Sequence, residues 1–143
     1  MNRFSKVILV FLLPLFAMVA CAADKPSAVP NVDHRRFVLV SVDGAPFSAS
    51  KKPDITFAEE LRISGQMCNR YMGQGVLDKG VLKVSQMAST KMFCMDAALN
   101  KVEDLFFSML MAGAEIELAG ESLILQQGGH VLVFTAVDIT QQF

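Results

Sequence analysis

The amino-acid sequence predicts an α+β domain in which a curved, mostly antiparallel β-sheet, a partial barrel, packs around one long α-helix. Apolar residues alternate with a period of two over most of the chain from Arg36 onward, as they do in strands. A single segment, from Asp96 to about Gly113, has the three- and four-residue spacing of an amphipathic helix. Further alternating segments follow this helix. Strands before and after one helix are typical of a sheet with one face covered by that helix.

The strands expected before the helix are bounded by turn residues. The first, from Arg36 to Val42, has apolar residues on both faces, which is typical of a largely buried strand, and Asp43-Gly44 ends it. The last two flank Asp78-Lys79-Gly80, a hairpin signal, and Glu59-Glu60 marks an exposed turn. The strands expected after the first are Ile55–Phe57, Leu61–Ile63, Tyr71–Val76 and Val81–Val84.

The helix has a start signal, a stop signal and one apolar stripe. Asp96 is a fitting N-cap, and Gly113 is a fitting stop. The stripe is formed by Leu99, Val102, Phe106 and Leu110, with Leu105 and Met109 widening it. Three strands with glycine-bearing turns between them are expected to follow: Ile116–Leu118, Leu123–Leu125 and Val131–Thr135.

The N-terminal segment has the features of an export signal. Of its first 20 residues 15 are apolar, and the positive charges of Arg3 and Lys6 precede the apolar run. This run is shorter than the roughly 20 residues of a membrane-spanning helix, and Pro14 interrupts it. We therefore expect a signal peptide over residues 1–20, a lipid anchor and tether over residues 21–33, and one domain over residues 34–143.

Cys21 lies directly after this signal, in the sequence Met18-Val19-Ala20-Cys21, which resembles a lipobox. We expect Cys21 to be lipidated. Ala22 in the next position, rather than aspartate, then suggests a periplasm-facing lipoprotein of the outer membrane. The alternative is ordinary cleavage within Ala20-Cys21-Ala22, which would remove Cys21 and leave a soluble periplasmic protein.

Cys68 and Cys94 are the two other cysteines. In an oxidising compartment two cysteines most often pair, and the bridge would close a loop of about 25 residues, worth roughly 3 kcal/mol. The alternative is a redox-active or nucleophilic thiol. The chain contains no C-x-x-C sequence, and neither cysteine has a neighbouring histidine.

Charge argues against nucleic-acid binding. Removal of residues 1–20 leaves 11 basic and 14 acidic residues, a net charge of 11 − 14 = −3. The longest basic runs are the pairs Arg35-Arg36 and Lys51-Lys52, so no basic cluster for nucleic acid or anionic lipid is expected.

No motif of a catalytic or metal site is found. His34 and His130 are isolated, whereas a zinc site needs three or four ligands at local spacing. There is no G-x-S-x-G sequence, Ser64-Gly65 is expected where a strand ends, and Glu103-Asp104 are helix neighbours that do not converge. We therefore expect no enzyme activity, no catalytic residue, no metal site and no cofactor.

Methionine is the one unusual feature of the composition. Thioethers are soft ligands that suit Cu(I), but methionine also lines adaptable binding grooves and fills cores, and all three explanations remain open. Next to Cys68, Asn69 and Arg70 are possible partner contacts; alternatively Asn69 satisfies a turn and Arg70 caps a buried strand end. The methionines near the cysteines are Met67, Met72, Met87, Met92 and Met95.

Two longer segments resemble motifs of a known family. Residues 63–73, ISGQMCNRYMG, resemble the S-G-x-x-C-N-x-[FY]-x-G motif of the META domain family and of its HslJ-type heat-shock lipoproteins. Residues 87–94, MASTKMFC, resemble the family's T-[RK]-M-x-C motif, with Lys91 where arginine is commoner. Residues 36–44 and 53–57 resemble its first strands, so the resemblance covers about residues 34–143.

The resemblance implies a stress-associated envelope protein without established catalytic residues, in a family linked to heat shock and to tolerance of aminocoumarins such as novobiocin. It also supports the lipid anchor. We therefore expect a non-enzymatic envelope lipoprotein that acts as a binding or assembly module. Its expected partners are the membrane, through the N-terminal lipid, and an unknown envelope protein or small apolar ligand. The alternative is a periplasmic small-ligand or Cu(I)-handling protein that uses the methionine-rich region.

Overall fold

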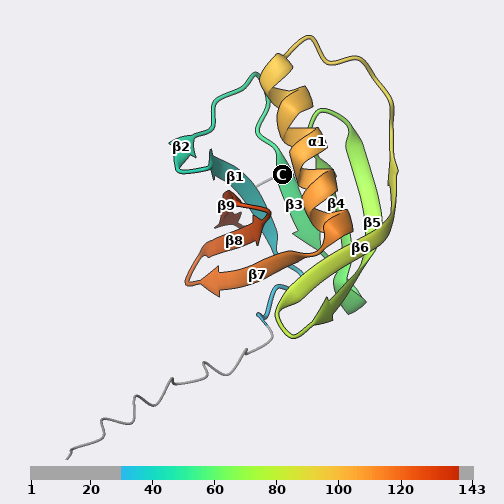
Figure 1. Cartoon of the computed structure of the whole chain (residues 1–143), viewed down its shortest axis with the longest axis vertical. Helices are drawn as coiled ribbons and strands as arrows, with labels where there is room; N and C mark the ends of the chain where they lie inside the picture. The colour runs from blue at the N-terminus through green and yellow to red at the C-terminus, as the bar shows by residue number, and fades with distance from the viewer. Residues whose placement is uncertain (1–29, 139–143) are drawn as a thin grey trace, which may run out of the picture.

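The computed structural model describes residues 30–138 of the 143-residue chain, so the expected signal peptide and Cys21 lie outside the described residues. Strands and one α-helix make up most of this part (Figure 1). In chain order the elements are β1 (Arg36–Val42), β2 (Ala45–Pro46), β3 (Asp54–Phe57), a 3-10 turn (Glu59–Leu61), β4 (Arg62–Gln66), β5 (Arg70–Asp78), β6 (Val81–Ser89), α1 (Ala97–Ala112), β7 (Ala114–Ala119), β8 (Ser122–Gln127) and β9 (His130–Val137).

The sheet closes into a barrel. All pairings among the described strands are antiparallel, in the order β1-β3-β4-β5-β6-β7-β8-β9, and β9 returns to pair with β1, from Arg36 opposite Val137 to Val42 opposite Leu132. The two-residue β2 only extends the edge of β1. The expected antiparallel sheet with one helix is therefore confirmed, but the expectation of a partial barrel is wrong. Pairing of the first and last strands closes it.

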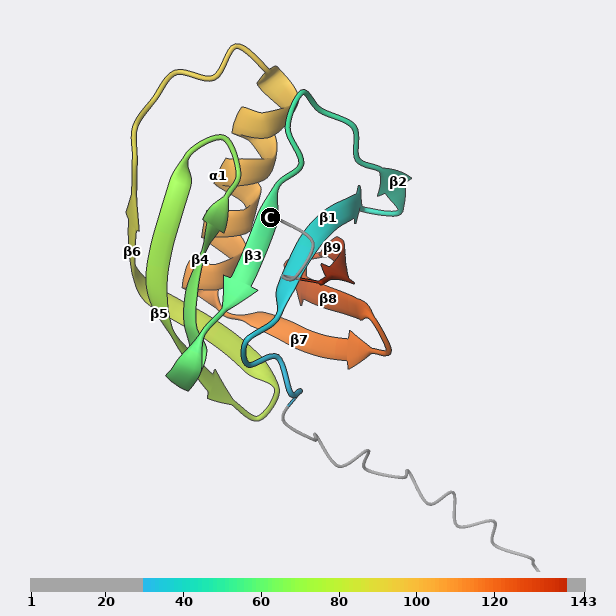
Figure 2. The ribbon, with the colours of Figure 1, turned by 180° about the vertical axis from the view of Figure 1, so that it is seen from behind.

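The helix begins and ends where the sequence predicts, but it is short rather than long. It has 16 residues, about 24 Å at 1.5 Å per residue, and is not the long helix anticipated from the sequence. It packs against β6 and β8, beside the point where β6 and β7 are joined by only two residue pairs, Val81 with Glu115 and Leu82 with Ala114 (Figure 2). Its buried residues are Leu99, Val102, Phe106, Met109 and Leu110, which belong to the predicted stripe.

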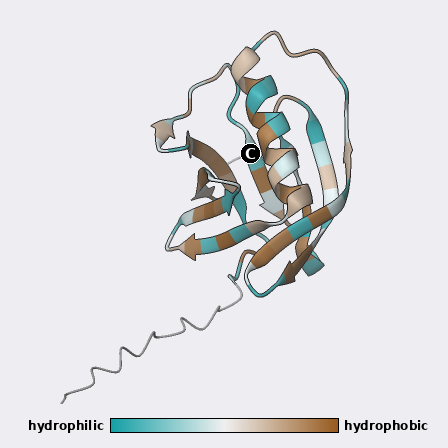
Figure 3. Ribbon diagram, in the orientation of Figure 1, coloured by the Kyte–Doolittle hydropathy of each residue, from teal (hydrophilic) through white to brown (hydrophobic). Residues whose placement is uncertain are grey.

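The core lies between the helix and the inner face of the barrel. Phe106 of α1 lies 5.2 Å from the ring of Tyr71 and 6.2 Å from that of Phe134, so aromatic side chains connect the helix to β5 and β9. Phe37 and Phe57 meet edge to face at 6.1 Å. Figure 3 shows the alternation of apolar and polar residues along the strands that turns one face inward.

Several strands differ in extent from the sequence prediction. β4 begins only at Arg62, because Glu60 and Leu61 have φ angles of 57° and 58° and cannot continue a strand. Gly65 lies within β4, between Ile55 and Tyr71, and does not mark a strand end as expected. A Cβ at Gly65 would collide with the backbone carbonyl of Asp54 and lie 2.8 Å from the Tyr71 hydroxyl. Glycine is required here because two elements approach closely.

The two ends of the barrel are covered by different segments of the chain. The described chain enters at one end, where Val32 is buried, and the segment between β6 and α1 crosses the other end (Figures 1 and 2). We call this segment, residues 90–96, the β6–α1 loop.

Candidate functional site

A disulfide fixes the β6–α1 loop to the barrel. Cys68 lies in the turn between β4 and β5, and Cys94 lies in the loop; the structure joins them, with their Cα atoms 6.0 Å apart. The side chain of Asn100, in the first turns of α1, donates a hydrogen bond to the carbonyl oxygen of Cys94 at 2.8 Å. The loop is therefore held both to the sheet and to the helix.

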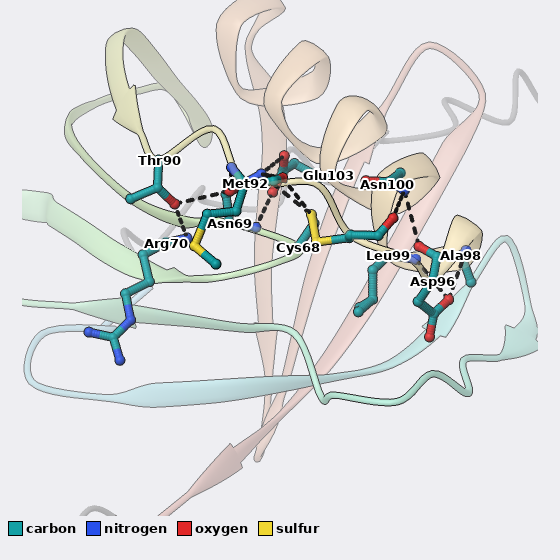
Figure 4. Close-up of a disulfide and its surroundings, with 11 residues drawn as sticks. Cys68, Asn69, Arg70, Thr90, Met92, Asp96, Ala98, Leu99, Asn100 and Glu103 are labelled. Carbon is teal, nitrogen blue, oxygen red and sulfur yellow. Dashed lines mark hydrogen bonds between the residues drawn. A yellow bond between two sulfur atoms is a disulfide. The ribbon is translucent and has the colours of Figure 1, made fainter.

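Asn69 is the centre of a buried polar network (Figure 4). Its Oδ1 accepts hydrogen bonds from the Met92 backbone N–H at 2.7 Å and from the Thr90 hydroxyl at 3.0 Å. Its backbone N–H and its Nδ2 donate to the two carboxylate oxygens of Glu103 at 2.6 and 3.0 Å. Asn69 thus connects the β6–α1 loop to the middle of α1, and every polar group of its side chain is used within the protein.

Asp96 ends the loop and begins the helix, as the sequence predicts. Its Oδ1 accepts from the backbone N–H groups of Ala98 and Leu99, at 3.0 and 3.4 Å, which is the geometry of an N-cap. Its Oδ2 accepts from the Ser50 N–H at 2.9 Å, so the loop before β3 is held here as well. These hydrogen bonds, with Ser50 contributing most, hold the pKa of Asp96 below its ordinary value.

Three large apolar side chains project from this fixed loop into solvent. Met92 is 72% exposed, Phe93 is 90% exposed and Met95 is 94% exposed. We call these three residues the apolar tip. A cleft of about 450 Å³ lies beside the tip, and its lining includes Lys51, Gln66, Cys68, Asn69, Arg70, Thr90 and Leu99. A fixed loop that exposes three large apolar groups next to a cleft is a candidate contact surface.

The tip is bordered by positive charge. Lys51 and Arg70 line the cleft and Lys91 precedes Met92 in the chain; all three are exposed, and we call them the basic rim. The sequence, which has no basic run longer than two residues, gives no sign of this grouping. The three residues are about 20 positions apart in the sequence, and only the folding of the barrel brings Lys51 beside Arg70.

Asn69 and Arg70 have different roles from each other. Asn69 is buried and its side chain is satisfied internally, in agreement with the alternative that it stabilises a turn. Arg70 is exposed, and its backbone N–H bonds to the Thr90 hydroxyl at 3.2 Å. Of the two residues predicted as possible partner contacts, only Arg70 is exposed, and its contact with a partner stays a prediction. Glu103, which the sequence suggests only as half of an unproductive acidic pair, is the residue that holds Asn69.

The methionines are not gathered in one place. Met67 is fully buried in the core, Met87 packs against the core, and Met72 is exposed on β5. Only Met92 and Met95 share the β6–α1 loop. Within residues 30–138 there is also no group of three histidine, cysteine, aspartate or glutamate residues suited to a metal ion.

The two histidines are exposed, His34 in a turn before β1 and His130 as the first residue of β9. His130 Nδ1 is 2.9 Å from Asp43 Oδ2, and the Val131 N–H donates to Asp43 Oδ1 at 2.8 Å. These contacts, the one with Val131 first, lower the pKa of Asp43. His34 Nε2 lies 4.0 Å from a carboxylate oxygen of Glu59. Both histidines thus lie at the surface.

Tyr71 is a buried phenol of β5. Its hydroxyl donates to the Asp54 carbonyl oxygen at 2.8 Å inside the core. Burial, and then the negative charge of Asp54, raise the pKa of Tyr71 well above 10.0. The phenol therefore stays protonated and serves as a structural donor between β5 and β3.

A second, more apolar cleft of about 410 Å³ lies between α1 and the β1–β2 region, and its lining includes Phe47, Lys101, Leu105 and His130.

Within the described residues, no helix combines the length and the hydropathy needed to cross a bilayer.

Comparison with known proteins relates the chain to several others. It is 35% identical over 137 residues to heat shock protein HslJ of Escherichia coli strain K12, covering 94% of this chain and 98% of that protein. One protein solved by NMR shares 38% identity, with a TM-score of 0.65 over 71% of this chain and 88% of its own. An NMR structure from Burkholderia xenovorans shares the fold at 20% identity, with a TM-score of 0.63 over 96% of this chain and 99% of its own.

The sequence profile of the META domain matches residues 30–138, which is the part of the chain that forms the closed barrel, the helix and the disulfide-fixed loop. The resemblance expected from the two cysteine-bearing motifs is thereby confirmed, and the chain belongs to the META domain family.

Proposed function

We propose that this protein is a non-enzymatic binding module of the cell envelope with a heat-shock-related role, and that the apolar tip with its basic rim is its contact surface. The heat-shock role is supported by the similarity to HslJ over nearly the full length of both chains. The META family is not known for an enzymatic activity.

The observation that carries the proposal is the exposure of Phe93 and Met95. Leaving such side chains in water costs about 1.5–3 kcal/mol each relative to burial. Their exposure therefore does not stabilise the fold, whose core is already filled by other residues. Aromatic residues, methionine and arginine are the types enriched where proteins contact partners, and Arg70 stands beside the tip.

A copper role is less well supported. A Cu(I) site requires several soft ligands in one place, whereas the cysteines form a disulfide and only Met92 and Met95 share the loop. A small apolar ligand would use the second cleft, by Phe47 and Leu105, rather than the methionines.

The lipid anchor at Cys21 and an outer-membrane location are part of the proposal. The intact mass of the protein purified from its host's membranes tests them. A lipid-sized increment on a chain that starts at Cys21 supports the anchor, and an unmodified chain that starts beyond Ala22 refutes it. A gain of about two mass units on reduction would report the Cys68–Cys94 bridge.

Survival of the host under heat challenge tests the proposed contact surface. A host strain lacking the protein is complemented with the wild type, with Phe93→Ser plus Met95→Ser, or with Val76→Ser, an exposed apolar position on β5 that lies outside the tip. We expect the tip variant to lose protection against heat challenge at unchanged protein level, while Val76→Ser retains it. Equal protection by all three would refute the tip as the contact surface. Growth at graded novobiocin concentrations, scored in the same strains, tests the tolerance phenotype.

A further inference from the structure

We infer that the apolar tip docks on the surface of an anionic phospholipid bilayer, with Phe93 and Met95 inserted among the acyl chains and the basic rim on the headgroup phosphates. This inference rests on the proposed function, because it names the partner of the same contact surface.

The exposure of the tip side chains favours a bilayer surface over a groove on a partner protein. Phe93 and Met95 are 90% and 94% exposed, so nearly all of each side chain stands clear of the protein. The loop that carries them is fixed by the disulfide and by the Met92–Asn69 hydrogen bond. Projecting apolar side chains on a fixed loop fit an interface where polar headgroups give way to acyl chains, as the apolar face of a membrane-surface helix does.

The charge beside the tip is complementary to an anionic surface. Lys51, Arg70 and Lys91 are exposed and available to phosphate oxygens. Three carboxylates of the same region are bonded within the protein: Asp96 accepts from the helix N-terminus and from Ser50, and Glu103 accepts twice from Asn69. Asp54 accepts from the Gln66 N–H and pairs with Arg36. Basic residues close to an anionic membrane surface each add to the attraction, and the effect depends on salt.

The chain outside the described residues is long enough for this arrangement. The described chain, which begins at Pro30, enters at the end of the barrel opposite the β6–α1 loop (Figures 1 and 2). Eight residues separate Cys21 from Pro30, and fully extended they reach about 28 Å. β5 runs along the barrel wall for nine residues, about 30 Å; because barrel strands tilt by about 35–45°, it rises only about 23 Å along the barrel axis, which is less than the reach of the tether. A chain anchored through Cys21 can therefore have its tip on the same bilayer.

The absence of tryptophan from the sequence allows a direct test. Phe93→Trp places one reporter at the tip, and Val76→Trp places a matched reporter at another exposed site. The experiment uses the chain from Ala22 to Phe143, which contains the whole closed barrel and no lipid. Each variant is titrated with vesicles of phosphatidylcholine alone and of phosphatidylcholine with phosphatidylglycerol, and the emission maximum is followed.

The expected result is a blue shift of the tryptophan at position 93 only with the anionic vesicles, and no shift of the tryptophan at position 76. In the Phe93→Trp background, Arg70→Glu with Lys91→Glu should weaken partitioning roughly tenfold or more, whereas Lys83→Glu on β6 should leave it within about twofold. The inference would be overturned if the emission maximum did not shift at position 93, if it shifted equally at both positions, or if the shift were the same with and without phosphatidylglycerol.

The vesicle and survival experiments separate the two proposals. If the tip variant loses heat protection but the reporter at position 93 does not respond to vesicles, the lipid inference fails, the binding module stands, and the partner is a protein. If that reporter responds but the tip variant protects as well as the wild type, membrane docking stands and the proposed role of the tip in heat protection fails.

Discussion

Glu103 receives two hydrogen bonds from Asn69, one from its backbone N–H and one from its side-chain amide, across 34 positions of sequence. The pair joins the β4–β5 turn to the middle of α1. The Oδ1 of the Asn69 side chain accepts a hydrogen bond from the Met92 N–H in the β6–α1 loop. One side chain thus determines how the sheet, the helix and the loop meet.

Replacing Asn69 with aspartate should destabilise the protein strongly. The substitution removes the side-chain donor to Glu103 and places a second carboxylate against it, so the free energy of unfolding should fall by about 3 kcal/mol. Urea unfolding measures the loss. Asp104→Asn, at the exposed neighbour of Glu103, should remain within about 0.5 kcal/mol of the wild type. Similar values for the two variants would mean that the network contributes little.

Removal of the disulfide should lower the free energy of unfolding by about 3 kcal/mol, because the unfolded chain regains the freedom of the loop between Cys68 and Cys94. The variant is Cys68→Ala with Cys94→Ala, and the measurement is the urea midpoint with and without reductant. Reductant should shift the midpoint of the wild type and leave that of the double variant unchanged. A midpoint of the wild type insensitive to reductant would contradict the prediction.

Stability should fall in acid partly through Asp96. Its pKa in the folded protein lies below the ordinary value of 3.8, because the Ser50 and helix N–H groups bond to the charged form. The stabilisation is therefore complete above about pH 4 and is lost as the pH falls through the lowered pKa. Asp96→Asn retains a good N-cap but cannot titrate, so its urea midpoint should depend less on pH between about 2 and 5. A pH dependence equal to that of the wild type would assign the acid sensitivity to other groups.

Gly65→Ala should be among the most damaging single substitutions. The added Cβ collides with the Asp54 carbonyl and with the Tyr71 hydroxyl that bonds to it. We expect a loss of about 3 kcal/mol or more, measured by urea unfolding or seen as loss of soluble protein. Ser64→Ala, at the neighbouring exposed position of β4, is the matched control and should be nearly neutral. A well-folded Gly65→Ala protein would show that β3 can move away from β4.

Local signals in the sequence were sufficient for most of the elements. Asp96 and Gly113 bound the helix as predicted, because an N-cap side chain and a left-handed glycine act on their immediate neighbours. The strand ends were less accurate. β6 continues five residues beyond Val84, through a polar stretch that pairs with β5 by register rather than by hydrophobic pattern.

The long-range features had no local signal. Closure of the barrel depends on β1 pairing with β9, about 95 positions later, and alternation within each strand does not specify its neighbour. Two further features follow from that closure and from the packing of the helix on the barrel. They are the pairing of Asn69 with Glu103 and the proximity of Lys51 to Arg70. The cysteine motif located the site, but which of its residues face inward was determined by tertiary structure.

The hydrogen bond between the Met92 N–H and Asn69 also affects how tightly the tip can bind. Ordering a free loop on contact costs about 1–2 kcal/mol for each backbone residue that is immobilised. Here that entropy is already lost when the domain folds, since the backbone at Met92 and Cys94 is bound to the barrel and the helix. A small apolar surface can then give measurable affinity, because little of its transfer free energy is spent on ordering the loop.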